Sequence, residues 1–299
     1  MTVKKTGKRL RTVYRDAPKG ILTLYLVLRG LVLLCLVMQA VNGNWFNVLL
    51  CVLTLFLLLL PALVETTFKV QLPTLLEVTV LLFVFSAEIL GEIGNFYQNI
   101  PHWDTVLHTI TGFWAAGVGF SLVDLLNRRS QRNHLTPVFV ALVAFCFSMT
   151  VGIVWEFFEF GSDRFLRTDM QKDRIVSRVD TVELDPNRSN TVVHIRGIDH
   201  TVMYDADGAE LARIEGGYLD IGIIDTMKDL FVNFIGAVVF SVTGFFYARS
   251  KGEKRTAAQS FVPSKKTEAT DYLKQAREES AAEDAAAPER AEPSNGEKT

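Results

Sequence analysis

The chain has 299 residues, of which 49% are hydrophobic and 21% charged, and its formal net charge is -2 at pH 7. A mean hydropathy of +0.22 fits either a large soluble domain or a polytopic membrane protein. The small net charge gives no indication of a nucleic-acid partner. The distribution of the apolar residues has to decide between the two classes.

Six apolar runs are each about 17 to 21 residues long, which is enough to cross a hydrocarbon core of roughly 30 Å. They lie at residues 21–41, 46–64, 74–90, 109–126, 137–157 and 230–247. The chain is therefore predicted to be an all-α polytopic membrane protein with six transmembrane helices, and the lipid bilayer is its first expected partner. The cysteines lie in these runs without metal-ligand spacing and are expected to be inert: Cys35, Cys51 and Cys146.

Lys and Arg gather in every second connection between the runs, and the positive-inside rule places these connections and both termini in the cytoplasm. The second helix is expected to stop by Pro61, and the fifth to run from Thr136 to Phe160. The predicted organisation is a basic cytoplasmic N-terminus at 1–20, helices 1–5 within 21–160, an extracytoplasmic β-rich insertion at 161–224, helix 6 at 225–248 and a disordered cytoplasmic tail at 249–299.

The segment between helices 5 and 6 changes from helical spacing to short β-like runs. These runs are separated by the turn sequences DPNRSN and DADG, so a small β-hairpin unit is predicted. Asp205, Asp207 and Gly208 partly match a calcium-binding loop. The later acidic ligands are missing, so a plain hairpin turn is favoured.

Acidic side chains occur at the outer ends of four predicted helices. An acid within hydrocarbon costs about 3 kcal/mol, so such residues usually face a bundle interior and mark a functional site. At α-helical spacing Glu88, Glu92 and Asn95 share one face, and the pairs Asp104/His108 and Asp225/Asp229 are each i,i+4. Like charges gathered at one depth require a bound cation or shared protons.

The candidate metal ligands are the acids and the imidazole at these ends: Glu88, Glu92, Asp104, His108, Glu156, Glu159, Asp163, Asp225 and Asp229. Oxygen-rich ligands with a single His suit Mg²⁺, Mn²⁺ or Ca²⁺, and Zn²⁺ stays open. The candidate catalytic residues are His108, Asp104 and Glu88, with His108 as general base or further ligand.

A purely structural interpretation of the same residues also stays open. Asp104 and Asp225 stand where helix-capping acids stand, and Glu159 and Asp163 could simply be solvated at the interface. A lone histidine such as His108 near a helix start is often a hydrogen-bonded structural residue.

Three stretches carry a resemblance to a known family: EILGEIGNFY followed by WDTVLH, WEFFEF with Asp163 just beyond it, and DTMKDLFVNFIGA. Together they resemble the YjdF-like family of uncharacterised bacterial inner-membrane proteins, over about residues 20–248. The resemblance implies a location in the bacterial cytoplasmic membrane and supplies no reaction. The segment between Asp163 and Asp225 looks longer than the connection in that family.

Three functions remain open on the sequence. The first is a metal-dependent membrane hydrolase or transferase that acts on a lipid or cell-envelope precursor. The second is a cation- or proton-coupled transporter that uses the acids as a relay. The third is a non-catalytic membrane scaffold that binds Ca²⁺ structurally. The sequence does not indicate an oligomeric state.

Overall fold

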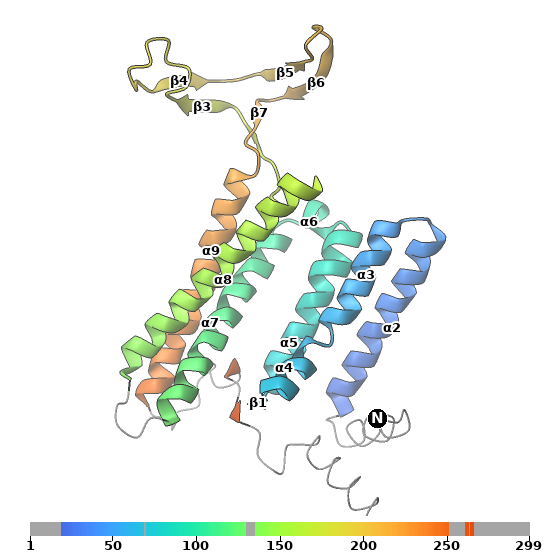
Figure 1. Cartoon of the computed structure of the whole chain (residues 1–299), viewed down its shortest axis with the longest axis vertical. Coiled ribbons are helices and arrows are strands. Elements are labelled where there is room, and N and C mark those ends of the chain that lie inside the picture. Colours follow the sequence, from blue (N-terminus) through green and yellow to red (C-terminus); the bar gives the residue numbers. More distant parts are fainter. Residues whose placement is uncertain (1–18, 69, 130–134, 251–260, 263, 266–299) are drawn as a thin grey trace, which may run out of the picture. The chain divides into compact units, whose positions relative to one another are not determined.

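The computed structural model describes residues 19–68, 70–129, 135–250, 261–262 and 264–265 (Figure 1). Six helical stretches in this part are long and apolar enough to cross a membrane, which confirms the predicted all-α polytopic fold. They are Gly20–Val41, Trp45–Glu65, Thr74–Ile93, Trp103–Asp124, Pro137–Leu166 and Ile223–Arg249. The chain forms two compact units, residues 1–99 with 260–299 and residues 100–259, which are described separately.

The first unit is built from helices around an apolar core. Its helical elements are α2 (Lys19–Val41), α3 (Trp45–Leu57), α4 (Leu60–Phe68), α5 (Thr74–Phe85), the π-helix η1 (Ser86–Ile93) and the short α6 (Phe96–Asn99). The buried side chains that join α2, α3, α5 and η1 are Leu28, Val32, Cys51, Leu58, Leu81, Val84 and Ile89. All of them are apolar, as expected for packing within a membrane.

Two expectations for the first unit are wrong. The helical path does not stop at Pro61, because α4 begins at Leu60 and places the proline in its first turn, where a missing N–H costs little. The segment with Glu88 and Glu92 is π-helical rather than α-helical, and Asn95 lies beyond it in a left-handed conformation with φ of 56°. Asn95 therefore leaves the predicted face, whereas Glu88 and Glu92 still interact electrostatically within η1.

The second unit is a three-helix bundle of α7 (Trp103–Arg129), α8 (Pro137–Leu166) and α9 (Ile223–Arg249). Glycine allows α7 and α9 to approach closely: a Cβ on Gly236 would clash with the Thr109 carbonyl, and one on Gly112 would clash with the backbone of Asn233. Deeper in the bundle, Phe120 and Phe240 are fully buried and meet edge to face at 6.0 Å.

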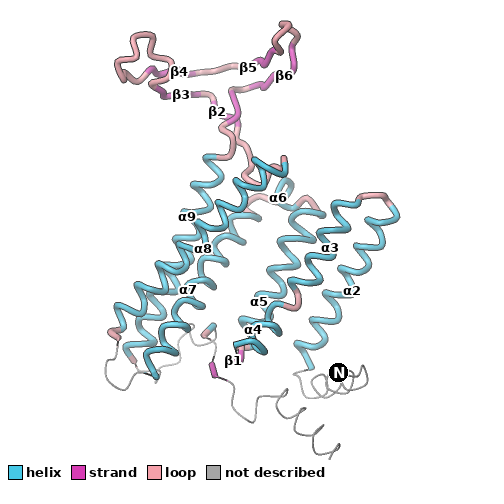
Figure 2. Tube along the Cα trace, in the orientation of Figure 1, coloured by secondary structure: helices cyan, strands magenta, loops and turns pink. Residues whose placement is uncertain are grey.

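The segment between α8 and α9, residues 167–222, is called here the β segment (Figure 2). It forms three antiparallel pairs: β2 (Ile175–Val176) with β7 (Tyr218–Leu219), β3 (Arg178–Thr181) with β4 (Val193–Arg196), and β5 (His200–Tyr204) with β6 (Glu210–Glu215). The predicted hairpins are thus confirmed, and α8 continues past Phe160 to Leu166 before the segment starts. Asp205 makes a plain turn by accepting from the N–H groups of Asp207 and Ala209.

The terminal predictions fall largely outside the described residues. Residues 1–18 of the predicted basic N-terminus lie outside them, as do residues 251–260, 263 and 266–299 of the predicted tail. Within the described part of the tail, β8 (Ser264–Lys265) pairs antiparallel with β1 (Val70–Gln71) of the first unit.

Candidate functional site

The bundle has one end where α7 and α9 begin and α8 ends, and the β segment joins the bundle there (Figure 1). This end is called the β-segment end. Acids from all three helices meet at this end because α8 runs antiparallel to α7 and α9. The polar pairs lie at the starts of α7 and α9, and the acids of α8 lie near its end. The antiparallel direction of α8 therefore brings these groups to the same end of the bundle.

The first pair lies in the opening turns of α7. Asp104 occupies the first turn, where the positive end of the helix dipole favours a carboxylate. His108 follows one turn later and places its Nε2 atom 3.3 Å from Asp104 Oδ1. The left-handed backbone of His102, with φ of 63°, turns the chain into this helix.

The start of α9 is fixed by Gly222 and Asp220. Gly222 is the residue before the helix and has a φ of 79°, which favours glycine. Burial raises the pKa of Asp220, but the N–H groups of Arg174, Ile224 and Gly222 donate to this carboxylate and outweigh that effect, so that its pKa falls below the ordinary value. An ionised Asp220 thus caps α9 and sets the register of its polar face.

Three residues from the two helix starts form a possible metal-binding triad. One ligand atom from each of Asp104, His108 and Asp229 lies within 4.8 Å of the others. Asp229 is only 2% exposed, and its Oδ2 lies 4.0 Å from His108 Nε2. Two carboxylates and an imidazole suit a hard or borderline divalent ion.

Lys228 supplies a positive charge to the same place. Its Nζ lies 3.1 Å from Asp104 Oδ2, 3.3 Å from Asp229 Oδ1 and 3.5 Å from Asp225 Oδ1. The side chain is 32% exposed, so part of it reaches the surface of the bundle. One lysine therefore neutralises part of a group that is otherwise dominated by carboxylates. The polar cluster is defined as Asp104, His108, Asp225, Lys228 and Asp229.

Asp225 joins the polar cluster to the base of the β segment. It is buried, and its Oδ2 accepts from the backbone N–H of Lys172 at 3.0 Å. Its Oδ1 lies 3.2 Å from Arg174 Nη2. Asp225 thus holds the backbone of Lys172, pairs with Arg174 and lies beside the triad through Lys228.

Glu156 and Glu159 approach the polar cluster from α8, and both are buried. Both carboxylates interact electrostatically with His108. Trp155 Nε1 donates to Glu159 Oε1 at 2.7 Å, and Gln171 Nε2 lies 3.5 Å from Glu156 Oε2. These two glutamates of α8 thus lie beside the triad.

Asp163 and the two acids of the first unit are placed differently. The two oxygens of Asp163 accept from the Thr168 hydroxyl and from the backbone N–H groups of Met170 and Gln171, so this carboxylate holds the chain as it leaves α8. Glu88 and Glu92 lie in η1 of the first unit, and their convergence with the second unit stays a prediction.

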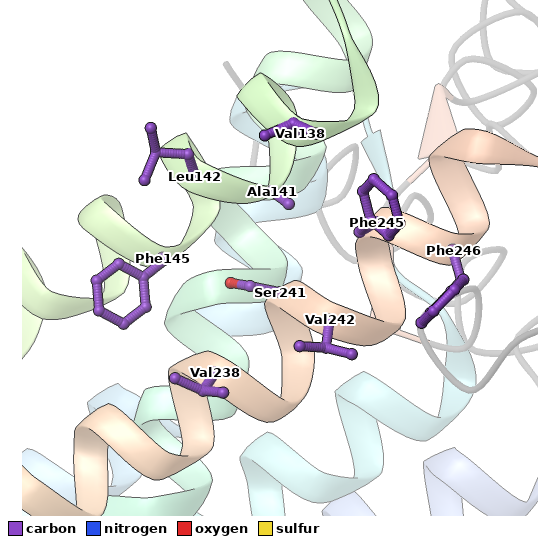
Figure 3. A pocket seen from close by; sticks show the side chains of 9 residues that line it. All are labelled: Val138, Ala141, Leu142, Phe145, Val238, Ser241, Val242, Phe245 and Phe246. Carbon is purple, nitrogen blue, oxygen red and sulfur yellow. The ribbon is translucent and has the colours of Figure 1, made fainter.

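An apolar groove lies between the other halves of α8 and α9 (Figure 3). It has a volume of about 410 Å³ and is lined by Val138, Leu142, Phe145, Val242, Phe246 and neighbouring side chains. Ser241 also lines it, is 8% exposed, and has no hydrogen-bond partner for its hydroxyl within the described residues. The groove contains none of the acids of the polar cluster.

Sequence reasoning missed the cations of this site. Lys228 stands three residues after Asp225 and one before Asp229, and a charged residue inside a membrane helix is itself a signal of function. Arg174 and Gln171 carry no such signal, because their contacts with Asp225, Glu156 and Thr226 depend on how the β segment folds back.

Comparisons with known proteins agree with a membrane fold. A family described as "Predicted membrane protein (DUF2238)" matches residues 21–250. An uncharacterised protein of Thermotoga maritima is 31% identical over 83 residues, which are 28% of this chain and 41% of that protein. The chain thus matches less than half the length of that relative. No solved structure matches the chain. The matching family is one of predicted membrane proteins, as the motif resemblance implies, and its description does not carry the YjdF name.

Proposed function

This chain belongs to that family of predicted membrane proteins, and we propose that it is a metal-dependent enzyme of the bacterial cytoplasmic membrane. In this proposal Asp104, His108 and Asp229 hold a divalent cation, and the protein hydrolyses or transfers a group on a lipid or cell-envelope precursor. The observation that carries the proposal is the triad itself, with ligand atoms from two helices within 4.8 Å of one another.

The charge balance supports a bound cation. Three carboxylates in the polar cluster share Lys228, and the buried Glu156 and Glu159 lie on the helix beside them. Taking ionised carboxylates out of water is costly unless they are paired. Lys228 and Arg174 offset two of these five negative charges, and a divalent ion would offset two more.

The residues around the triad suit hydrolysis or group transfer. When bound, a divalent cation lowers the pKa of its water and polarises the bond under attack. Glu156 and Glu159 are carboxylates beside His108 and are placed to accept the proton of that water. Lys228, which reaches the surface of the bundle, is placed to contact an anionic group of the substrate.

In this proposal the β-segment end of the bundle lies outside the cytoplasm and both termini lie inside, and the basic connections support that orientation. An active centre at a helix end lies at the height of the lipid headgroups. For this reason the proposed substrates are lipids or envelope precursors, which present their polar groups at that depth.

The direct test is the metal content of the full-length protein purified from metal-replete membranes. We expect a stoichiometric divalent ion in the wild type, and a melting temperature that falls in the presence of a chelator. Asp229→Asn should remove both the ion and the effect of the chelator. Asp199→Asn is a matched control, because Asp199 forms an exposed pair with His200 at 2.9 Å, and it should change neither property. A wild-type protein without an ion, whose melting temperature ignores the chelator, would refute the proposal.

One observation favours a different function. Lys228 bridges three carboxylates, as residues of a proton or cation relay do. A transporter of this kind would carry protons or a monovalent cation across vesicle membranes, and Asp229→Asn would abolish that flux while the purified protein held no divalent ion.

A further inference from the structure

Asn233 is a buried polar residue with an unused hydrogen-bond acceptor. Its side chain is 1% exposed, and its Oδ1 has no partner within the described residues. Its Nδ2 makes only long contacts, at 3.5 Å to the Ser148 carbonyl and 3.7 Å to Met149 Sδ. Inside a membrane, a polar group without a partner is costly and marks function by default.

The position of Asn233 relates it to the polar cluster. It lies four residues after Asp229 on α9, so the two side chains share a face and are one turn apart. Side chains on a helix lean toward its N-terminus, which for α9 is the β-segment end. The amide of Asn233, one turn further from the β-segment end than Asp229, therefore points toward the level of Asp229.

On α8, which runs antiparallel to α9, side chains lean in the opposite direction, and this brings the Glu156 carboxylate toward the level of Asn233. Glu156 leans toward the N-terminus of α8, over the turn that contains Gly152. Gly152 has no side chain, and a Cβ placed there would lie 2.7 Å from Asn233 Nδ2 and 3.3 Å from Asn233 Oδ1. The absence of a side chain at Gly152 thus leaves room for the Asn233 amide, at the level of the bundle toward which the Glu156 side chain points.

We propose that Asn233 Oδ1 is a further oxygen ligand of the cation held by Asp104, His108 and Asp229, on the inner side of that site. This inference rests on the proposed function, because it requires that an ion binds there. A neutral amide oxygen added to two carboxylates favours Mn²⁺ or Mg²⁺ over Zn²⁺, which prefers nitrogen and sulfur ligands. Asn233 is then a determinant of metal preference, with Gly152 providing the space for it.

The test compares Asn233→Leu with the wild type in the full-length, detergent-solubilised protein. Free Mn²⁺ is titrated by electron paramagnetic resonance, and Zn²⁺ is titrated by competition with a chromophoric chelator. We expect Asn233→Leu to weaken Mn²⁺ binding about tenfold or more, and to weaken Zn²⁺ binding less. The melting temperature of the metal-free variant should stay equal or rise, because leucine removes an unpartnered buried amide.

Ser241→Ala is the matched control. Ser241 is another buried side chain of α9 whose hydroxyl has no partner in the described part of the chain. It lies eight residues further along the helix, about 12 Å away at 1.5 Å per residue. Its removal should leave the affinity for Mn²⁺ unchanged. A purely structural effect of removing a buried polar group would appear in both variants, whereas a ligand effect appears only at Asn233.

Each outcome decides the inference. Equal Mn²⁺ affinity in the wild type and Asn233→Leu would overturn it, as would equal losses for Mn²⁺ and Zn²⁺, while the proposed function would stand. A wild type that binds neither ion would overturn the proposed function and this inference with it. If Asn233→Leu does not fold, Asn233→Asp decides: a carboxylate oxygen at this position should tighten Mn²⁺ binding, and an unchanged affinity would contradict the proposal.

Discussion

The two units are both built from helices of membrane-spanning length, but different groups hold those helices together. In the first unit the buried side chains that join the helices are apolar, and the buried polar residue among its described residues is Thr54, whose hydroxyl donates to the Leu50 carbonyl. In the second unit the helix interfaces contain buried Glu156, Glu159 and Asp229. Membrane helices can thus associate through ordinary side-chain packing, or through close backbone contact that leaves room for charge.

The difference has a physical basis. Hydrocarbon solvates an apolar helix as well as another helix does, so association in a bilayer depends on close packing and on polar contacts. The second unit has both, with Gly112 and Gly236 at the crossing of α7 and α9 and the polar cluster at the end of the same crossing. Its stability and its candidate chemistry are therefore expected to depend on the same helix contacts.

The largest effect is expected from a substitution that separates α7 from α9. Gly236→Ala would place a Cβ against the Thr109 carbonyl and 2.8 Å from the Phe113 amide nitrogen, and backbone atoms cannot turn away as a side chain can. We expect a loss of about 3 kcal/mol in the free energy of unfolding, together with weaker metal binding. Unfolding in mixed micelles measures the first, and Mn²⁺ titration the second.

Gly30→Ala is the matched change in the first unit. A Cβ at Gly30 meets nothing within 4 Å, and alanine favours the helix over glycine, so the free energy of unfolding should stay equal or rise slightly. If both variants lost the same stability, the contrast between the two units would be wrong.

A smaller effect is expected from Lys228→Met, which tests whether charge compensation stabilises the polar cluster. Removing one partner from a fully buried ion pair costs about 3–5 kcal/mol, and the partial exposure of Lys228 reduces the expected loss to about 2 kcal/mol. Millimolar Mn²⁺ should recover more stability in this variant than in the wild type, because the ion replaces the missing charge. Thermal unfolding with and without Mn²⁺ measures both.

Arg213→Met provides the comparison for Lys228→Met outside the bundle. Arg213 pairs with Glu210 on the surface of a hairpin at 3.2 Å, and solvent screens such exposed pairs so that they contribute little to stability. Little change is expected, with or without Mn²⁺. An equal response to Mn²⁺ in both lysine and arginine variants would argue against a cation site at the polar cluster.

The smallest effect concerns the turn around Asp185 in the β segment, where the carboxylate accepts from residues within six positions of it. The Ser189 hydroxyl and the N–H groups of Asn187, Thr191 and Ser189 donate to Asp185 and lower the pKa of its carboxyl to about 2 from 3.8. Because the folded pKa is lowered, this stabilisation is complete above pH 3.8 and is lost as the pH falls through 2. Hydrogen exchange at these three amides should accelerate over that range, while amides of the β5–β6 hairpin should not follow the same curve.

Much of the fold followed from local patterns. The length of the apolar runs was enough to predict six membrane helices, and the turn sequences DPNRSN and DADG were enough to predict two hairpins. The spacing of Asp104 with His108, and of Asp225 with Asp229, correctly placed each pair on one helix face. These features depend on neighbours within a few residues, which a sequence displays directly.

Which residues make up the site depends on contacts between distant parts of the chain, and the spacing of residues in the sequence does not predict these contacts. Asp163 was among the candidate metal ligands, yet its oxygens accept from the backbone of Met170 and Gln171, in a loop whose conformation no local pattern predicts. The unpaired oxygen of Asn233 depends on the absence of a side chain at Gly152 of another helix. Which polar groups lack a partner is a property of the packed bundle, and periodicity gives no account of it.

The base of the β segment holds its two ends together. Asp220 holds the Arg174 amide at 2.6 Å, and the pairing of Ile175 with Leu219 follows directly above it, so the strands entering and leaving are fastened together at the root. Beyond such a neck, doubling the length of the insertion costs only about 0.6 kcal/mol in closure entropy. The hairpins can therefore be grafted, shortened or exchanged for another module while the helices beneath keep their geometry.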